Sequence, residues 1–165
     1  MTLSVKAVAA RLEIGRIDWS AYRAPASGGP GLRDLFLGLL DANDESEAVG
    51  CSLEYRLEVQ SMVYEVALPA VGVILAAYAE DLPLWVEMEF LNVLHNIITG
   101  EPHRSELELG NFDLVDRCIE RARDGIWVMY SRLSKWNSDF LLDVLEVVDS
   151  DRERFAVFKA GFYPE

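Results

Sequence analysis

Helical periodicity dominates this sequence from Leu32 almost to its end. Apolar residues recur at intervals of three, four and seven, and one such set is Leu32, Leu35, Phe36 and Leu39. This spacing brings apolar side chains to one face of a helix. No segment alternates apolar and polar residues over a length that demands a β-sheet. The sequence therefore predicts an all-α protein.

The breakers and caps divide the periodic stretches into separate helices. Asp44 and Glu47 form a capping-box pattern at the start of one of them. Pro69 is expected either to bend a helix or to mark its start. A loop rich in glycine and proline covers Ala24–Gly31, and a polar connection covers Glu101–Asn111. We expect helices over residues 3–13, 32–40, 44–60, 63–78, 84–99, 113–133, 138–149 and 151–160.

The expected helices form pairs, and the pairs resemble one another. Ala67–Tyr78 aligns with Ala122–Leu133, and the helices that follow have similar endings, Phe90–Leu94 and Leu141–Leu145. Leu32–Gln60 fits as an earlier pair. Stacked two-helix repeats bury their apolar faces against their neighbours and form an α-solenoid. We therefore predict one domain over residues 1–165, with an N-terminal segment and loop at 1–31 and about three helical pairs over 32–160.

The charge is strongly negative and unevenly distributed. The chain carries a formal net charge of -13, and residues 34–103 hold thirteen acidic residues against one base, Arg56. Such a chain is a poor candidate for binding nucleic acid or an anionic membrane, because both require clustered Lys and Arg. It favours a basic partner.

Several other features indicate a cytoplasmic protein. The N-terminus lacks the apolar core and cleavage site of a signal peptide. The longest apolar run, Val66–Ala79, contains proline and glycine and is too short to cross a bilayer. Cys51 and Cys118 fall in helical patterns and are expected to be unpaired.

The outward faces of the second helices carry the candidate binding residues. Each of these helices presents a polar or acidic stripe opposite its apolar face, and in a solenoid equivalent helices line one surface side by side. The stripes are then expected to merge into one acidic face that contains a tryptophan, which can anchor a cationic partner. The stripes consist of Glu47, Glu54 and Glu58, then Trp85, Glu89, Asn92 and Asn96, then Asp139, Asp143 and Glu146. The alternative is that these stripes are simply the solvated faces of amphipathic helices.

Catalytic and metal-binding motifs are not evident in the sequence. His95 lies among apolar residues and reads as a core histidine, because no second His or Cys is spaced to share a metal with it. His103 is expected to lie in a loop and to have no evident partner. The hydroxyl of Tyr64 is expected to form a hydrogen bond with the backbone. The glycines near Pro30 lack the lysine of a phosphate-binding loop. We therefore expect a protein that is not an enzyme, with no cofactor and no metal.

The order of these features resembles a bacterial HEAT-like repeat family. The resemblance covers roughly residues 17–150 and is carried by Asp18-Trp19, the Gly/Pro-rich turn, Leu32–Leu40, Gln60–Val66, Leu68–Val71 and Phe90–Gly100. The chain departs from the family at Gly72 and at Ala76-Ala77, where bulkier core residues are usual. Many members look like immunity proteins of bacterial competition systems, so the resemblance implies a helical solenoid that neutralises a toxin.

Together, charge and resemblance predict an acidic protein-binding module whose carboxylates occlude the active site of a basic toxin. Two alternatives remain open. One is a structural or regulatory adaptor with no toxin partner. The other is an enzyme similar to the HEAT-like DNA glycosylases, although those require a basic groove, which this acidic chain does not offer.

Overall fold

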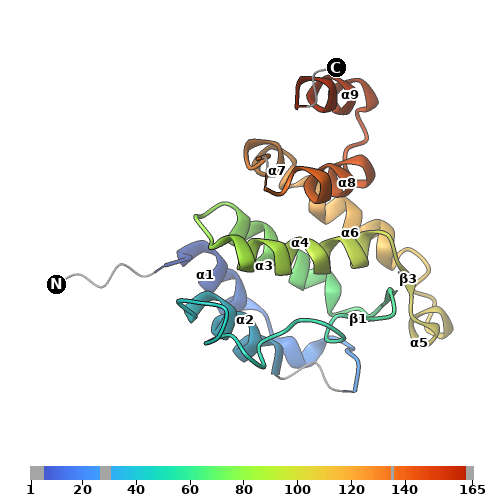
Figure 1. Ribbon diagram of the computed structural model, residues 1–165. Helices are drawn as coiled ribbons and strands as arrows, with labels where there is room; N and C mark the ends of the chain where they lie inside the picture. Colours follow the sequence, from blue (N-terminus) through green and yellow to red (C-terminus); the bar gives the residue numbers. More distant parts are fainter. Residues whose placement is uncertain (1–5, 27–30, 135, 163–165) are drawn as a thin grey trace.

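The computed structural model describes residues 6–26, 31–134 and 136–162, and these are mostly helical (Figure 1). This confirms the predicted all-α class, to which the structure adds one very small sheet. The elements in chain order are α1 (Val8–Arg16), the 3-10 turn η1 (Trp19–Ala21), α2 (Leu32–Asp41), β1 (Glu58–Val59), β2 (Met62–Val63), α3 (Ala67–Tyr78), α4 (Leu84–Ile98), β3 (Glu101–Pro102), α5 (Arg104–Glu108), α6 (Leu114–Arg123), α7 (Ile126–Ser131), α8 (Ser138–Val148) and α9 (Arg152–Phe162).

Helix α3 is the central element of the core and packs against α1 and α6. Its small residues allow this close packing. A Cβ added at Gly72 would lie 3.0 Å from both Oε1 of Glu13 on α1 and Nη2 of Arg121 on α6. These two side chains form an ion pair of 3.6 Å beside the glycine. Gly72 therefore makes room for a polar contact between two neighbouring helices.

Helix α4 continues the packing toward the C-terminus. It contacts α3, α6 and α8, and α9 then packs on α8. Figure 1 shows α9 at the top of the molecule and α2 in its lower part, below α3 and α4. One continuous set of buried apolar residues, including Phe36, Phe90 and Leu141, runs through this arrangement.

Two prolines mark helix starts. Pro69 is the third residue of α3, so it marks the beginning of that helix and does not bend its middle. Pro83 precedes the first residue of α4. The predicted helix at 63–78 consequently begins four residues later than expected, and Val63 belongs to β2.

The predicted helix at 44–60 is wrong, and with it the first of the three expected pairs. One half of the capping pattern forms, because Asp44 accepts hydrogen bonds from the amides of Ser46 and Glu47, whereas the carboxylate of Glu47 accepts from the amide of Asn43. The chain then continues in turns, with positive φ at Gly50 (87°) and Tyr55 (58°). A left-handed conformation at these positions cannot belong to an α-helix.

Leu53 and Leu57 explain why the spacing was misleading. Both are buried, as the predicted apolar face requires, but a turn conformation brings them to the core. Val49, the third residue of that face, is 83% exposed. A spacing of four thus identified two core residues without identifying the backbone that carries them.

A hairpin and one parallel strand replace the end of the predicted helix. β1 pairs antiparallel with β2, and β2 pairs parallel with β3. Gln60 and Ser61 both have positive φ, as a tight two-residue hairpin turn requires. The carbonyl of Ser61 also approaches Gly100 so closely that a Cβ there would lie 2.2 Å from the oxygen. Gly100, two residues after the end of α4, therefore leaves room for the hairpin.

The single helix predicted over 113–133 is two helices, α6 and α7, separated at Gly125. A Cβ at Gly125 would lie 2.4 Å from Cδ2 of Leu75 on α3. The break lets α7 contact α3 and α8 in turn.

The N-terminal helix predicted over residues 3–13 is observed as α1, which begins at Val8; residues 1–5 lie outside the described residues. Residues 27–30 of the predicted Gly/Pro-rich loop also lie outside them. Cys51 and Cys118 are free, as expected. Among the described helices, none combines the length and apolar character needed to cross a bilayer.

Candidate protein-binding surface

The stripe predicted on α4 forms on that helix. Trp85, Glu89, Asn92 and Asn96 fall within about 60° of one another at ~100° per residue, while Phe90 and Leu94 are buried. Trp85 and Glu89 are half-buried and Asn92 is exposed. Trp85 and Glu89 line a hollow of about 310 Å³ together with residues of the 45–52 segment.

Glu89 has a structural role that the sequence did not indicate. Its Oε1 accepts hydrogen bonds from the backbone amide of Leu53 at 2.9 Å and from Oγ of Ser52 at 3.2 Å. These bonds attach the turn segment of residues 51–57 to α4. The carboxylate is therefore partly engaged within the protein.

The stripe predicted on α8 is intact and exposed. Asp139, Asp143 and Glu146 all project from the surface, and α8 itself contains no basic residue. With Leu142 of the same helix they line a hollow of about 320 Å³, whose other wall is Phe155 and Lys159 of α9.

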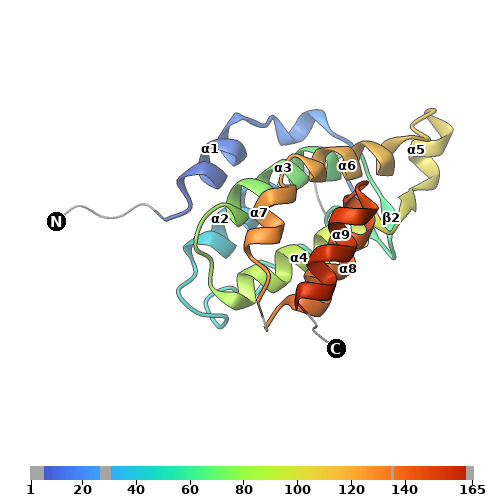
Figure 2. The same cartoon turned by 90° about the horizontal axis from the view of Figure 1, so that it is seen from above.

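These two stripes face the same side of the molecule. The rings of His95 on α4 and Phe140 on α8 lie 5.5 Å apart. Around the axis of α4, at ~100° per residue, His95 lies about 90° to one side of the centre of the α4 stripe. Around the axis of α8, Phe140 lies about 90° to the opposite side of the centre of the α8 stripe. The two helices run in the same general direction in Figures 1 and 2. Side-by-side helices in contact through these flanks present their stripes together.

The third set, Glu47, Glu54 and Glu58, does not form a stripe, because the helix that was to carry it does not exist. Glu58 is 5% exposed and accepts a hydrogen bond from the amide of Ser61 at 2.6 Å in the hairpin. Glu47 is exposed and bonds the amide of Asn43 at 2.8 Å. Glu54 is exposed in a separate turn. Of the three predicted stripes, the structure thus brings together those of α4 and α8.

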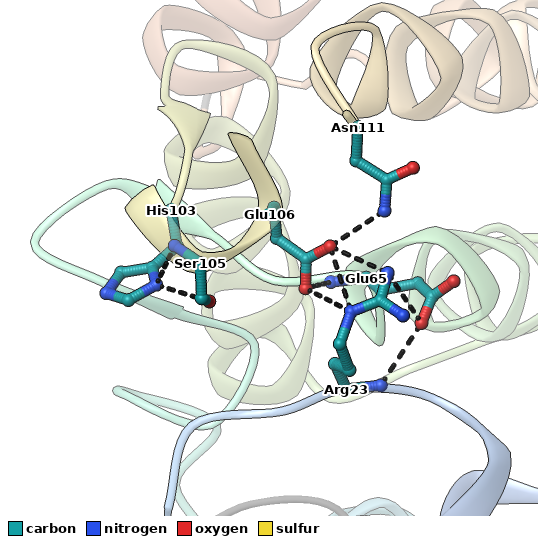
Figure 3. A network of polar contacts seen from close by, with 6 residues as sticks. All are labelled: Arg23, Glu65, His103, Ser105, Glu106 and Asn111. Atoms are coloured by element: carbon teal, nitrogen blue, oxygen red, sulfur yellow. Dashed lines mark hydrogen bonds and ion pairs between the residues drawn. The ribbon is translucent and has the colours of Figure 1, made fainter. Parts of the chain in front are cut away.

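A buried polar network that the sequence did not predict lies at the base of α5 (Figure 3). Glu106 is fully buried, and its carboxylate accepts bonds from Nη2 of Arg23 at 2.8 Å, from Nδ2 of Asn111 at 2.8 Å and from the amide of Glu65 at 3.3 Å. Burial raises the pKa of Glu106, but the bonds from Arg23 and Asn111 outweigh it and hold the pKa below its ordinary value.

Tyr64 and His103 contact each other beside this network. The imidazole of His103 stacks on the ring of Tyr64 at 4.3 Å, and its Nδ1 accepts a bond from the amide of Ser105 as the cap of α5. His103 therefore has partners, contrary to the expectation. The network joins the N-terminal segment, the start of α3 and α5.

A second buried carboxylate links α7, α8 and α9. Asp149 is 1% exposed and accepts bonds from the hydroxyl of Tyr130 at 2.6 Å and from Nε of Arg154 at 2.8 Å. The bond from Arg154 holds the pKa of Asp149 well below its ordinary value. Within the described ranges, no group of three or more His, Cys, Asp or Glu is arranged to hold a metal ion.

Comparisons of the chain with protein families, with characterised proteins and with solved structures find no match.

Proposed function

We propose that this protein is an acidic protein-binding module that acts as an immunity protein, neutralising a basic bacterial toxin by covering its active site. The observation that carries the proposal is the shared orientation of the α4 and α8 stripes, which joins Trp85 and Asn92 with Asp139, Asp143 and Glu146 on one side. In this proposal the chain acts in the cytoplasm as a binding protein without cofactor or metal.

The proposed surface has the chemistry of a site for a basic protein. Its carboxylates supply charge, and the indole of Trp85 supplies an apolar face that a cationic side chain can cover. The net charge of -13 accelerates encounter with a basic partner at low ionic strength. The engaged carboxylate of Glu89 and the buried Glu58 contribute to the negative field without contacting the partner directly.

We further propose that the helices form a short HEAT-like solenoid. The supporting observation is the pairing of α3 with α4, followed by α6 and α7 with α8, in which α3 packs on α6 and α4 on α8. With the first predicted pair replaced by α2 and a turn segment, this solenoid has fewer full pairs than the sequence suggested.

Charge reversal tests the proposed surface. The partner is a basic protein captured on the immobilised chain and purified, and calorimetry measures its affinity. We expect the triple variant Asp139→Lys, Asp143→Lys and Glu146→Lys to bind at least about 100-fold more weakly, because several close charge pairs each contribute roughly 1 kcal/mol or more. The same variant should fail to inhibit the partner's toxic activity.

A matched control separates the surface from net charge alone. Glu108→Lys, Asp116→Lys and Glu120→Lys change the net charge by the same amount at exposed positions on α5 and α6. We expect this variant to slow association without a large change in dissociation. Equal losses of affinity in the two triple variants would show that the α4–α8 surface is not the binding site.

A further inference from the structure

The segment between α5 and α6 carries an apolar knob. Leu109 is 63% exposed and Phe112 is 72% exposed, and these two side chains, three residues apart, form the knob. Leu107, near the end of α5, is exposed as well. Large apolar side chains that are exposed close together on a protein surface mark a site of interaction with another molecule.

The buried network around Glu106 holds the knob in a fixed position. The carbonyl of Glu106 accepts a bond from the amide of Asn111 at 3.0 Å, and its carboxylate accepts one from Nδ2 of the same residue at 2.8 Å (Figure 3). Gly110, with a φ of 85°, turns the chain between these two residues. Because Glu106 is fully buried against Arg23, both ends of this loop are attached to the core. A segment that is already ordered loses little conformational entropy when it binds.

An apolar hollow lies between α7 and α9. It measures about 370 Å³, and the residues that line it carry no charge: Tyr130, Leu133, Val157, Phe158, Gly161 and Phe162. Both walls are firmly held, because the rings of Tyr130 and Phe158 lie 4.2 Å apart and Arg154 of α9 donates to the buried carboxylate of Asp149 at 2.8 Å. A well-anchored apolar hollow lined by aromatic side chains suits an apolar anchor from another surface.

The knob and the hollow of one chain are far from each other. In Figure 1, α9 lies at the top of the molecule and α5 at the lower right, with α8 and α6 between them. The knob of one chain can therefore enter only the hollow of a second chain.

The surroundings of the knob and of the hollow differ in charge. Residues 101–116 expose one base, Arg104, and four acids, which are Glu101, Glu108, Asp113 and Asp116. Helix α7 has no charged residue, and α9 has three bases against one acid. Even with Arg154 paired to Asp149, these two helices keep a net positive charge. Two chains of net charge -13 repel each other over most of their surfaces, but the acidic knob segment is attracted to this end.

We propose that this protein associates with itself head to tail, with the knob of one chain in the α7–α9 hollow of the next. The two contacting surfaces are different, so each added chain leaves a free knob at one end and a free hollow at the other. Association of this kind continues beyond two chains, into a ring or an open fibre.

This self-association does not depend on the proposed function. At ~100° per residue, the hollow lies about 110° around α9 from Phe155 and Lys159, which line the other hollow beside the α8 stripe. The acidic stripes therefore stay accessible in the assembly.

Sedimentation velocity of the full chain at increasing concentration tests the head-to-tail contact. We expect the weight-average mass to rise continuously with concentration and to pass that of two chains. A mass that stays at one chain up to about 1 mM overturns the proposal. A mass that stops at two chains also overturns it, because a symmetric contact closes after two copies.

Two single variants each remove one half of the contact. Phe112→Asp places a charge on the knob, and Val157→Asp places one in the hollow; both positions are exposed, so the fold is retained. We expect each variant alone to associate at least about 30-fold more weakly than the unchanged protein, as the loss of a central apolar anchor does.

An equimolar mixture of these two variants gives the sharpest test. The intact knob of Val157→Asp can enter the intact hollow of Phe112→Asp, while the other two surfaces are blocked. We therefore expect a complex of two chains and nothing larger. A mixture whose chains stay separate overturns the proposal.

Two further variants test specificity and charge. Leu12→Asp is the matched control, because Leu12 is 70% exposed on α1, and we expect it to associate like the unchanged protein. Glu101→Lys combined with Asp116→Lys should associate about 10-fold more weakly, since the opposing end is basic. A loss in Leu12→Asp equal to that in Phe112→Asp, or undiminished association of the double variant, overturns the proposed contact.

Discussion

At the scale of single residues, Glu106 depends on the guanidinium of Arg23. The acid is fully buried, while the arginine side chain is 43% exposed. Arg23→Ala leaves the carboxylate buried without its main cation, and we expect the free energy of unfolding to fall by about 2–3 kcal/mol, after allowance for the solvent exposure of the arginine. Urea denaturation at pH 7 measures this difference.

Arg104→Ala is a suitable control, because it removes an exposed ion pair with Glu108. Such pairs contribute about 0–1 kcal/mol. If Arg23→Ala lowers the free energy of unfolding no more than Arg104→Ala does, the Glu106 network is not a structural link.

The lowered pKa of Glu106 predicts how its contribution depends on pH. The ionised form is favoured in the folded state, so the stabilisation is complete above the ordinary pKa of 4.5 and is lost as the pH falls through the lower folded value. We therefore expect Glu106→Gln to be less stable than the unchanged protein at pH 7, and the gap to narrow below about pH 4.5. Thermal melts between pH 7 and pH 3 measure the gap, and Glu108→Gln, at an exposed site, should show no such trend.

At the scale of elements, Glu89 is expected to hold the 51–57 segment in place. Glu89→Ala removes the acceptor of the Leu53 amide and the Ser52 hydroxyl. We expect faster hydrogen exchange at Leu53 and its neighbours with little change in α4, because the bond is local. Asn92→Ala, less than one turn further along α4, should leave the exchange unchanged. Protection of Leu53 that persists in Glu89→Ala would contradict this role.

The break between α6 and α7 gives a second prediction at this scale. Gly125→Ala forces the Leu75 side chain to move, and we expect a loss of about 1–3 kcal/mol in the free energy of unfolding. Gly15→Ala in α1 meets no atom within 4 Å and should instead stabilise the protein by about 0.5–1 kcal/mol. Chemical denaturation measures the free energy of unfolding of both variants, which we expect to fall for Gly125→Ala and to rise for Gly15→Ala.

The elements also show what the sequence could predict. Helices α2, α4 and α8 were predicted closely, because their apolar periodicity coincides with their burial. The segment after Asp44 was not predicted correctly. A capping pattern and two leucines four residues apart are compatible with a helix and equally with successive turns. Tertiary contacts determine the conformation of this segment, since Glu89 accepts a hydrogen bond from the amide of Leu53, 36 residues away in the sequence. The network of Glu106 escaped prediction for the same reason, because Arg23 lies 83 residues away.

At the scale of the whole molecule, the uncompensated charge opposes the compact state. Thirteen acidic residues against one base between positions 34 and 103 create mutual repulsion that folding concentrates in a small volume. Salt shortens the reach of this repulsion, from a Debye length of about 30 Å at 0.01 M to about 10 Å at 0.1 M. The protein should therefore be more stable in moderate salt than in dilute buffer.

We expect the melting temperature at pH 7 to rise by roughly 2–4 °C as NaCl increases from 0.01 M to ~0.3 M, which corresponds to a gain of about 1 kcal/mol for a chain of this size. Scanning calorimetry measures the shift. Glu45→Lys, Glu101→Lys and Glu120→Lys replace exposed acids on three separate segments, so this triple variant should show a smaller rise. A melting temperature that falls with salt would mean that the ion pairs such as Arg11–Asp41 outweigh the repulsion, because screening weakens attraction and repulsion alike.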